Sequence, residues 1–257
     1  MELQIGFNEV EIDALENKSV EAVWTYYNVQ DKSHTIIPDG RADLILTFDI
    51  LLGGKVSNIR PIICLPFTKA LVMNIKAHQG FIGIRFRAGS ADTFLNTPIC
   101  NISDSLQSGK HALAHAPWLE NLYRNKNSVN QLFTSINQHL CVKPTQSRSS
   151  MVTDILSLIH ETQGLSQVSS IAQQIDFSER TINRQFSNAV GLSPKQYSSI
   201  IRLRRAMECL ADPNYAISSI AVDCGYSDQA HMTRELKNYM GQTPTRLQKS
   251  IDQQIII

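Results

Sequence analysis

The sequence SIAVDCGYSDQAHMTREL, residues 219–236, repeats a pattern that already occurs as SIAQQIDFS at residues 170–178. One extra residue enters the second copy after this stretch, and the match between the copies then resumes. Both copies end alike, with GLSP at residues 191–194 and GQTP at residues 241–244. Such self-similarity indicates one supersecondary unit that is used twice.

Each copy has the residue types of a helix-turn-helix. The first helix is short and carries a small alanine, Ala172 or Ala221, where the next helix must cross closely. The turn needs a residue that tolerates a positive φ angle, which Gly225 does fully and Asp176 less well. Aromatic side chains are expected to fill the corner of each turn: Phe177 and Tyr226.

The second helix of each copy has one apolar and one polar face. Ile182 and Phe186 are expected to be buried in the first copy, and Met232 and Leu236 in the second. Arg, Asn and Gln near the start of a helix can hydrogen-bond base edges in the major groove of DNA. The candidate DNA-binding residues are Ser178, Arg180, Thr181, Asn183, Arg184, Gln229, His231 and Arg234.

These polar faces have an alternative interpretation as the solvated surface of a helical bundle. A single unit does not decide between the two, because the pattern is loose. Two units in tandem, with Arg184 and Arg234 at matching positions, favour DNA binding. His231 fits either a DNA contact or packing beside Arg234. Serine or aspartate can cap the two helices: Ser178 in the first copy, Ser227 or Asp228 in the second.

The segment between the copies predicts one long helix. Pro194 can begin it with a pre-set φ angle, and an apolar stripe continues to Leu210. From Pro194 to Ala211 it would span about 27 Å, close to one DNA turn of about 34 Å. Basic residues around it and in the second copy are candidate phosphate contacts: Lys195, Arg202 and Lys237.

The N-terminal half predicts β-structure. Short segments rich in β-branched and aromatic residues alternate with turn signals, which is typical of a sandwich or barrel. Helices are expected at residues 90–95, 118–124 and 128–140. A polar stretch without periodicity, residues 143–150, is expected to be a linker. The expected strands are residues 20–27, 44–48, 60–66, 70–77 and 81–86.

Composition limits the class of protein. Hydrophobic residues make up 42% and charged residues 18%, so a buried core is expected. Five scattered cysteines without a CxxC pair argue against a disulfide framework or a zinc knuckle. The N-terminus has early acidic residues, and no stretch approaches 18 apolar residues, so neither a signal peptide nor a membrane span is expected. A cytoplasmic protein is the expectation.

The C-terminal segment, from about Met151 to Lys249, resembles the DNA-binding domain of AraC/XylS-type transcription regulators. The sequence GYSDQAHMTR at residues 225–234, followed by NYMGQTP at residues 238–244, is close to that family's signature. The resemblance implies that two helices enter the major groove. It implies contacts from Arg180, Asn183 and Arg184 in the first helix, and from Gln229, Ala230 and Arg234 in the second. Asp176 in place of a turn glycine, and Ala230 with no base-reading group, depart from the pattern.

The N-terminal half resembles sensor domains that precede this module in one branch of the family. The sequences PDGRADLI at residues 38–45 and GIRFRAG at residues 83–89 carry the similarity. It implies a small cupin-like β-barrel domain that takes an effector of unspecified chemistry. The expected fold is therefore α+β: a barrel-like sensor or dimerisation domain at residues 1–145, and an all-α domain with two helix-turn-helix motifs at residues 151–250.

The leading hypothesis is a sequence-specific transcription regulator without catalytic activity, cofactor or metal. Its expected partners are double-stranded promoter DNA, RNA polymerase, a small-molecule effector and a second copy of the chain. Two alternatives are a cupin-like metal enzyme and a protein-interaction adaptor. The enzyme needs a cluster of metal ligands, and the expected strands offer only His34 and His78.

Several other residues have competing interpretations. His111 and His115 have metal-ligand spacing, but a third ligand is not evident. Arg85 and Arg87 could bind an anionic effector, although pairing with carboxylates is favoured. An apolar stripe at residues 129–140 fits a dimer helix pair or packing on the chain's own barrel, and the first is favoured. Cys64 and Cys100 are expected to be buried apolar fillers.

Overall fold

The computed structural model describes residues 4–10, 17–142, 149–250 and 254–255, and it has an α+β fold. The N-terminal part is built on a six-stranded antiparallel sheet with the order β1-β2-β7-β4-β5-β8. Alternating buried side chains place Ile82, Ile84 and Phe86 of β7 on one face of this sheet and Arg85 on the other. The strands are β1 (Gly6–Val10), β2 (Val20–Tyr27), β4 (Ala42–Ile50), β5 (Val56–Cys64), β7 (Gln79–Phe86) and β8 (Leu106–Ser108).

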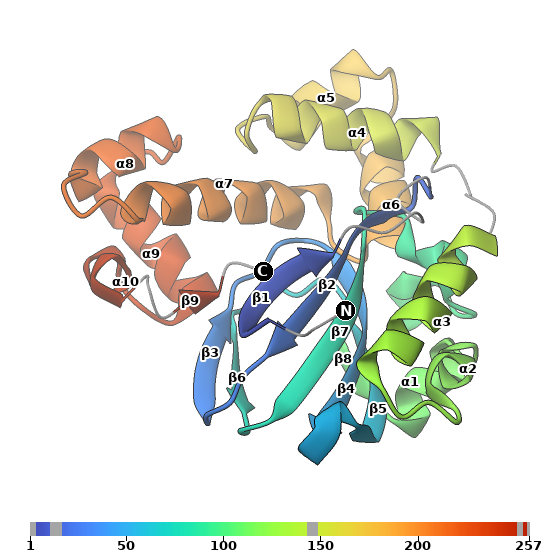
Figure 1. Cartoon of the computed structure of the whole chain (residues 1–257). Coiled ribbons are helices and arrows are strands. Elements are labelled where there is room, and N and C mark those ends of the chain that lie inside the picture. Colours follow the sequence, from blue (N-terminus) through green and yellow to red (C-terminus); the bar gives the residue numbers. More distant parts are fainter. Residues whose placement is uncertain (1–3, 11–16, 143–148, 251–253, 256–257) are drawn as a thin grey trace.

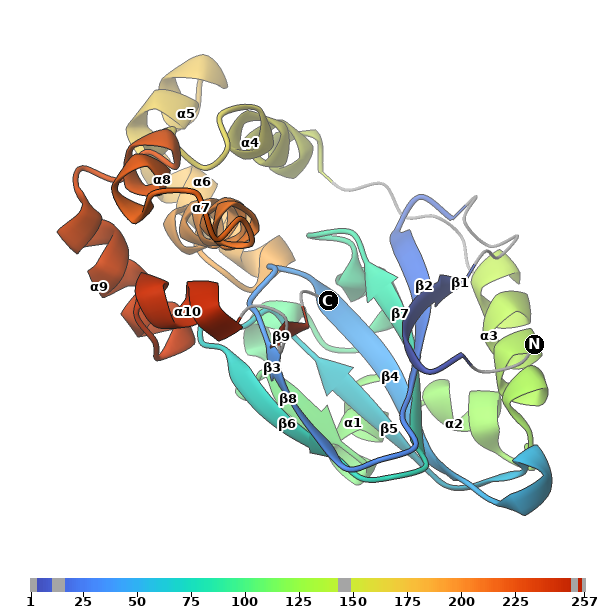
Figure 2. The ribbon, with the colours of Figure 1, turned by 60° about the vertical axis from the view of Figure 1, so that its left-hand side comes forward.

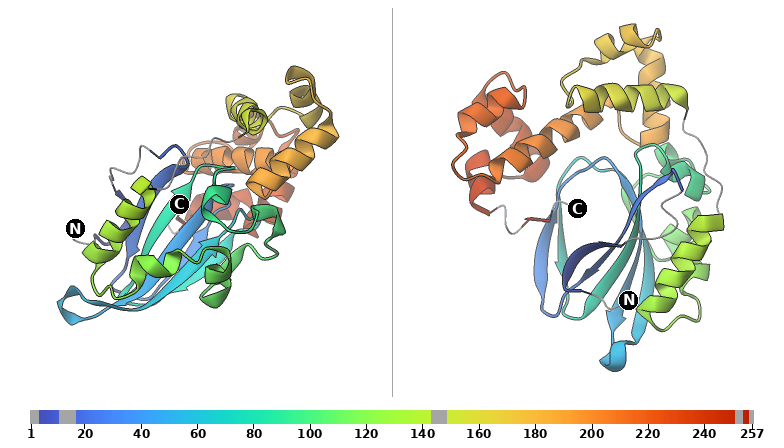
Figure 3. Two further views of the ribbon diagram at one scale, coloured as in Figure 1. Left: turned by 90° about the vertical axis from the view of Figure 1, so that its right-hand side faces the viewer. Right: turned by 45° about the horizontal axis from the view of Figure 1, so that its top comes forward.

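A second sheet has three strands in the order β6-β3-β9. Strand β3 (Lys32–Ile36) pairs antiparallel with β6 (Leu71–Ile75) and parallel with β9 (Gln254–Ile255). The C-terminal end of the described chain therefore returns to the N-terminal part. Together the two sheets curve into an open barrel (Figure 3). Their facing sides enclose a cavity.

Three helices cover the outer face of the larger sheet. They are α1 (Lys110–His115), α2 (Leu119–Tyr123) and α3 (Val129–Val142), drawn in green in Figure 1. The apolar stripe of α3 is buried in the same core as the sheet, with Leu132 0% and Ile136 1% exposed. The expectation that this stripe pairs two copies of the chain is therefore wrong, because the chain's own barrel already covers it.

The segments around these elements differ in part from the sequence prediction. The expected helix at residues 90–95 is a short 3-10 turn, η3 (Ala91–Phe94), and a second turn, η4 (Ile99–Asn101), follows it. Cys64 is half-buried, whereas Cys100 is exposed, so Cys100 is not a core filler. The predicted linker, residues 143–150, lies mostly outside the described residues, and its last residue begins the next helix.

The C-terminal part is helical. Helix α7 (Pro194–Leu210) runs between two groups of helices, α4 to α6 at one end and α8 to α10 at the other (Figures 1 and 2). These helices are α4 (Ser150–Glu161), α5 (Val168–Gln174), α6 (Glu179–Val190), α8 (Ile217–Asp223), α9 (Gln229–Met240) and α10 (Pro244–Ser250).

The helical part has its own apolar core, in which α7 is central. The predicted stripe of α7 is buried, and its members Ile200, Leu203, Met207 and Leu210 are all 0% exposed. One residue of the N-terminal part, Ile37, is buried in this same core.

The two parts also touch at both groups of helices. The side chain of Ile99 in η4 approaches Gly191 at the end of α6. The backbone N–H of Ala70 donates to the carbonyl of Tyr239 near the end of α9, over 2.7 Å. Helices α6 and α9 therefore both contact the N-terminal part near their C-terminal ends. None of the described helices is long and apolar enough to cross a membrane.

Truncating the centre of α7 should destabilise the protein strongly. We expect Leu203→Ala to lower the free energy of unfolding by about 2–5 kcal/mol, because the side chain is buried and its removal leaves a cavity. Urea denaturation followed by circular dichroism measures the change. Leu52→Ala is the matched control, since Leu52 is 100% exposed, and it should change the free energy by about 0.5 kcal/mol or less. Equal effects of the two variants would contradict the central place of α7.

Candidate functional site

The first candidate DNA-reading helix, α6, begins at a well-formed cap. Ser178 accepts a hydrogen bond from the backbone N–H of Thr181 over 3.2 Å, which satisfies one of the free donors at the helix start. The preceding turn places Asp176 at a φ of 56°. The sequence predicted a left-handed residue there, and Asp176 adopts this conformation despite carrying a side chain. Gly191 ends α6 at a φ of 81°.

The second helix, α9, repeats this construction. Gly225 has a φ of 71° in the turn, and Asp228 accepts from the backbone N–H of His231 over 2.6 Å. This hydrogen bond, first among several causes, lowers the pKa of Asp228. The carboxylate therefore stays charged at the positive end of the helix dipole. Of the two predicted capping residues, Asp228 fills the role. Gly241 ends the helix at a φ of 69°.

The predicted DNA-binding side chains fall into two groups. Within the described residues, Arg180, Arg184 and Arg234 are exposed and make no hydrogen bond or ion pair with the rest of the chain. The exposed set also includes Gln229, Ala230, Lys195 and Lys237. Ser178 is exposed too, but its hydroxyl belongs to the cap of α6. The first group is free to contact DNA.

The other side chains are partly used inside the protein. The hydroxyl of Thr181 bonds Ser178 over 2.9 Å, and the amide of Asn183 donates to the carbonyl of Glu179 over 2.8 Å. The ring of His231 lies 3.2 Å from the hydroxyl of Ser227 and 3.7 Å from Glu235. Each would have to exchange an internal contact for a contact to a base or phosphate.

Arg202, which the sequence predicts as a phosphate contact, makes several contacts inside the protein. Its guanidinium donates to the carbonyl of Gly164 and to the hydroxyl of Ser199, each over 3.2 Å. It also lies 3.4 Å from Glu235 on α9 and 5.8 Å from the ring centre of Tyr226. Arg202 therefore links the α4–α5 turn, α7 and the second unit, and it contributes to their relative placement.

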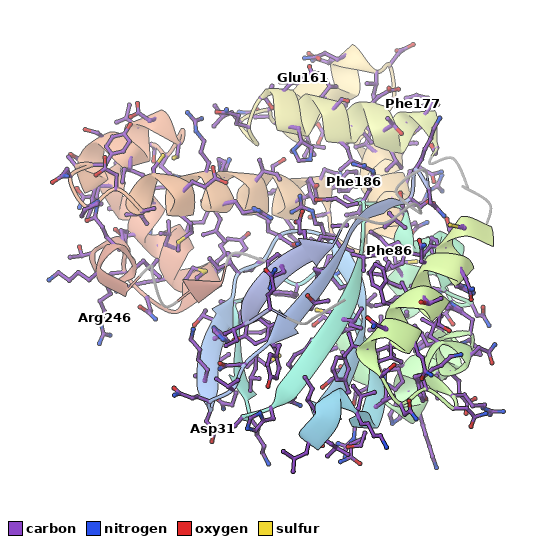
Figure 4. All side chains as sticks on the ribbon, viewed as in Figure 1. Asp31, Phe86, Glu161, Phe177, Phe186 and Arg246 are labelled. Carbon is purple, nitrogen blue, oxygen red and sulfur yellow. The ribbon has the colours of Figure 1, made fainter. Side chains whose placement is uncertain are left out.

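The two turn aromatics do not play the same part. Tyr226 is 4% exposed and fills its corner as predicted, but Phe177 is 47% exposed. Figure 4 marks Phe177 at the edge of the helical region, whereas Phe186 lies inside it. The core of the first unit is closed by Phe186 and Ile182, both 0% exposed, so Phe177 is not needed as a plug.

A second candidate site is the cavity between the two sheets. Its volume is about 470 Å³, and apolar side chains from both sheets form most of its wall. Asp39, Asp43 and Arg85 provide charge at this wall. The Nε atom of Arg85 lies 3.3 Å from Asp43 and 3.9 Å from Asp39. Arg85 therefore pairs with carboxylates, as favoured from the sequence, while Arg87 is exposed and lines a different cleft.

Burial changes the pKa of one carboxyl group in the wall of this cavity. Desolvation raises the pKa of Asp43 to about 6, opposed by the nearby Arg85 guanidinium. The indole N–H of Trp24 donates to Oδ1 of Asp43 over 2.8 Å. A polar pair of this kind in an otherwise apolar cavity can orient a small ligand that carries both a donor and an acceptor.

The histidines considered as metal ligands have other surroundings. Nε2 of His34 is bonded to the hydroxyl of Tyr26, and Nδ1 of His78 lies 3.2 Å from that of Tyr27. His115 contacts the hydroxyl of Thr97 over 3.1 Å. Within the described ranges, no three His, Cys, Asp or Glu side chains are grouped as a metal site would require.

Comparison with known proteins identifies the helical part. Residues 171–250 match a family model described as a helix-turn-helix domain. The relatives of this chain are AraC-family regulators. The C-terminal helices form an AraC-type helix-turn-helix domain. Residues 17–107 match a model described as a domain of unknown function (DUF6597), so the sheet region has a family but no assigned role.

Two curated relatives are transcription regulators by name. The Msm operon regulatory protein of Streptococcus mutans is 26% identical over 159 residues, which is 62% of this chain and 52% of that protein. The transcriptional activator RhaS of Escherichia coli is 29% identical over 83 residues, which is 32% of this chain and 30% of RhaS. The chain thus spans about half or less of the length of these relatives.

Solved structures of AraC-type regulators and of a DNA-binding domain are also similar to part of this chain. An AraC-type transcriptional regulator from Chromobacterium violaceum is 26% identical, with a TM-score of 0.36, and covers 39% of this chain and 90% of its own. The DNA-binding domain of AdpA, solved in complex with a target DNA, is 20% identical with a TM-score of 0.37, covering 40% of this chain and 93% of its own.

Sequence reasoning missed the residues that connect the sheet region to the AraC-type domain. Asp39 enters the sequence analysis only as part of the PDGRADLI similarity, yet it lies within 4.0 Å of Arg204 on α7. Gly40 lies against the ring of Tyr197, where a Cβ atom would come within 2.5 Å of the ring. The sequence PDG at residues 38–40 is typical of a turn, but no local pattern indicates which distant helix contacts this turn.

Replacing the strained turn residue should stabilise the domain. We expect Asp176→Gly to raise the free energy of unfolding by about 0.5–1 kcal/mol, because glycine adopts a positive φ angle without steric cost. Asp176→Ala is the matched control and should lower it, since alanine keeps the Cβ atom and lacks the local hydrogen bonding of aspartate. Thermal unfolding measures both. A stabilising alanine would contradict strain as the cause.

The raised pKa of Asp43 should be visible in the fluorescence of Trp24. In a Trp118→Phe background, we expect the emission to change with a midpoint near pH 6, the value to which burial raises this pKa. Trp118 is removed because it stacks on His139 and adds its own signal. Asp43→Asn should abolish the transition, and a transition that persists in it would refute the assignment.

The same shift predicts a direction for stability. The folded protein holds the proton of Asp43 more tightly than the unfolded chain does. The resulting stabilisation is fully present below the ordinary aspartate pKa of 3.8 and is lost as the pH rises through about 6. Thermal unfolding of the parent chain and of Asp43→Asn between pH 4 and 7 should therefore show a difference that changes across this window.

Proposed function

We propose that this protein is a sequence-specific, DNA-binding transcription regulator and not an enzyme, with residues 151–250 as the DNA-binding domain. The observation that carries the proposal is a pair of capped helices, α6 and α9, whose exposed Arg184 and Arg234 side chains make no hydrogen bond or ion pair within the described residues. Guanidinium groups on the exposed face of a helix suit bidentate recognition of guanine. The proposed partner is double-stranded promoter DNA, and the proposed location is the cytoplasm.

Residues 1–145 are proposed to be the sensor part. The cavity between the sheets, with Asp43 and Arg85 in a largely apolar wall, has the size and composition of a small-molecule site. An effector bound there would shift the population of DNA-competent states through the contacts between Asp39 and α7. Contact with RNA polymerase and assembly with a second copy complete the proposal. Neither rests on the buried stripe of α3.

The test is base-specific DNA binding by two arginine variants. A preferred duplex is first selected from a random library with the full chain. We expect Arg184→Gln and Arg234→Gln each to weaken binding to it by about 5–150-fold, the equivalent of roughly 1–3 kcal/mol for a lost bidentate contact. Competition gel shifts at fixed salt measure the change, with mutated bases in each half of the duplex.

The control is Arg60→Gln, because Arg60 is an exposed arginine on β5, outside the helical part. It should bind DNA like the parent chain. A parent-like affinity of both recognition variants would refute the proposal. An equal loss on every duplex would make the two residues phosphate contacts and would contradict base recognition.

A further inference from the structure

A cleft of about 630 Å³ separates the sheet region from the helices above it. Its lower wall contains Glu21 of β2 and the β3–β4 connection, and its upper wall contains α4 and α7. Figure 2 shows α4 and α7 lying across this end of the sheet. The cleft is distinct from the cavity between the sheets, although Asp39 lines both. Nothing in the DNA-binding role accounts for it.

The carboxylates on the sheet side of the cleft already have a cationic partner. Arg41 lies 2.6 Å from Glu21 and 3.6 Å from Asp39. Asp39 also accepts from the backbone N–H of Arg41 over 2.9 Å. These contacts neutralise much of the negative charge that the cleft would otherwise present.

The other guanidinium groups of the cleft lack hydrogen-bond acceptors in the part of the chain that the structure describes. Arg87 follows β7 and Arg205 lies on α7, and within the described residues neither side chain makes a hydrogen bond or an ion pair. Nη1 of Arg204 is buried without a hydrogen-bond partner, and its nearest carboxylate oxygen, on Asp39, is 4.0 Å away. A buried donor without an acceptor costs free energy. The cleft thus has spare donors on both of its walls.

We propose that this cleft binds a compact, multiply charged anion that bridges Arg87 of the sheet region and Arg205 of α7. Guanidinium groups bind phosphate and carboxylate groups through paired hydrogen bonds. Four arginines face three carboxylates here, the third being Glu208, which leaves an excess of positive charge. A ligand with two or more negatively charged groups could bind Arg87, Arg204 and Arg205 together, because each group can accept from a different guanidinium. Hydroxyl and amide groups of α4 and its following turn, on Ser157 and Gln163, suit a hydroxylated ligand.

Such an anion would act on the arrangement of the two parts. Because its arginines come from both parts, it binds tightly only when they are docked, and it stabilises that state by mass action. The docked state also holds Ile99 against the end of α6 and Ala70 against the end of α9. The ligand would therefore fix the relative position of the two DNA-reading helices. This last step rests on the proposed function, whereas the binding of the anion does not.

The experiment measures binding of inorganic pyrophosphate and of citrate to the full chain by calorimetry, at ionic strength matched with sodium chloride. We expect saturable one-to-one binding of at least one of them. Arg87→Gln and Arg205→Gln should each weaken it by about tenfold or more, as for loss of a charge-assisted contact. Arg60→Gln, on the sheet away from the cleft, should bind like the parent chain. Unchanged thermal unfolding without ligand confirms that the variants fold.

The two probes distinguish the source of the charge. Tighter pyrophosphate binding identifies a phosphorylated ligand, and tighter citrate binding identifies a polycarboxylate. The ring of His160, 3.1 Å from the hydroxyl of Tyr197 in the cleft wall, gives a second readout. Burial and the nearby Arg41 lower its pKa, and a bound anion should raise it in a proton NMR titration.

Two results would overturn the proposal. One is binding no stronger than that of chloride, or equal binding by both cleft variants and the parent. The other is a loss of DNA affinity in Arg87→Gln or Arg205→Gln without any anion, together with a reduced salt dependence, which would make these arginines phosphate contacts. That second result would leave DNA binding intact as a function, so the two proposals fail separately.

Discussion

The apolar stripe of α7 is the constraint on which the helical part depends. Leu203 and Met207 at its centre are completely buried, and α7 contacts α4 and α6 toward one end and α8 and α10 toward the other. A single stiff helix therefore contributes to the cores of both helix-turn-helix units. Their recognition helices cannot move independently while this core is intact. Arg202 adds a polar link by joining α7 to Gly164 on one side and Glu235 on the other.

The connection from β3 to β4 ties the sheet region to this core. Ile37 is buried among the helices, and Gly40 lies against the ring of Tyr197 at a distance that leaves no room for a Cβ atom. Asp39 lies between Arg85 on the sheet side and Arg204 on α7. Because this short connection borders both the sheet cavity and the cleft, a ligand in either one would act on the same contacts to α7. Buried charges of this kind cost desolvation energy and are sensitive to the loss of one partner.

The arginines of the AraC-type domain differ between two surfaces, the one formed by α6 and α9 and the one that faces the sheet region. The exposed arginine side chains of α6 and α9 make no hydrogen bond or ion pair within the described residues, whereas Arg204, which faces the sheet region, is partly buried and lies 4.0 Å from Asp39. Arginine therefore serves as a recognition group at one surface and as a connection between the two parts at the other. Composition alone cannot separate these uses, because the net charge of +1 averages over both.

The sequence by itself determined the features that depend on near neighbours. The repeat, the cap at Ser178, the left-handed turns at Asp176 and Gly225 and the buried stripe of α7 all follow from local spacing, because hydrogen bonding within one turn and helical periodicity leave a direct pattern. Most strands of the larger sheet were predicted from short segments rich in β-branched and aromatic residues, which are also a local pattern.

Tertiary structure decided the rest. It placed Arg202 in an internal network, left Phe177 exposed, turned the stripe of α3 toward its own barrel and set Asp39 against α7. These outcomes depend on which distant surface meets each residue. An amphipathic helix or a charged side chain carries the same local pattern whether it packs inside the chain, binds a partner or faces water. Only the assembled fold settles that choice.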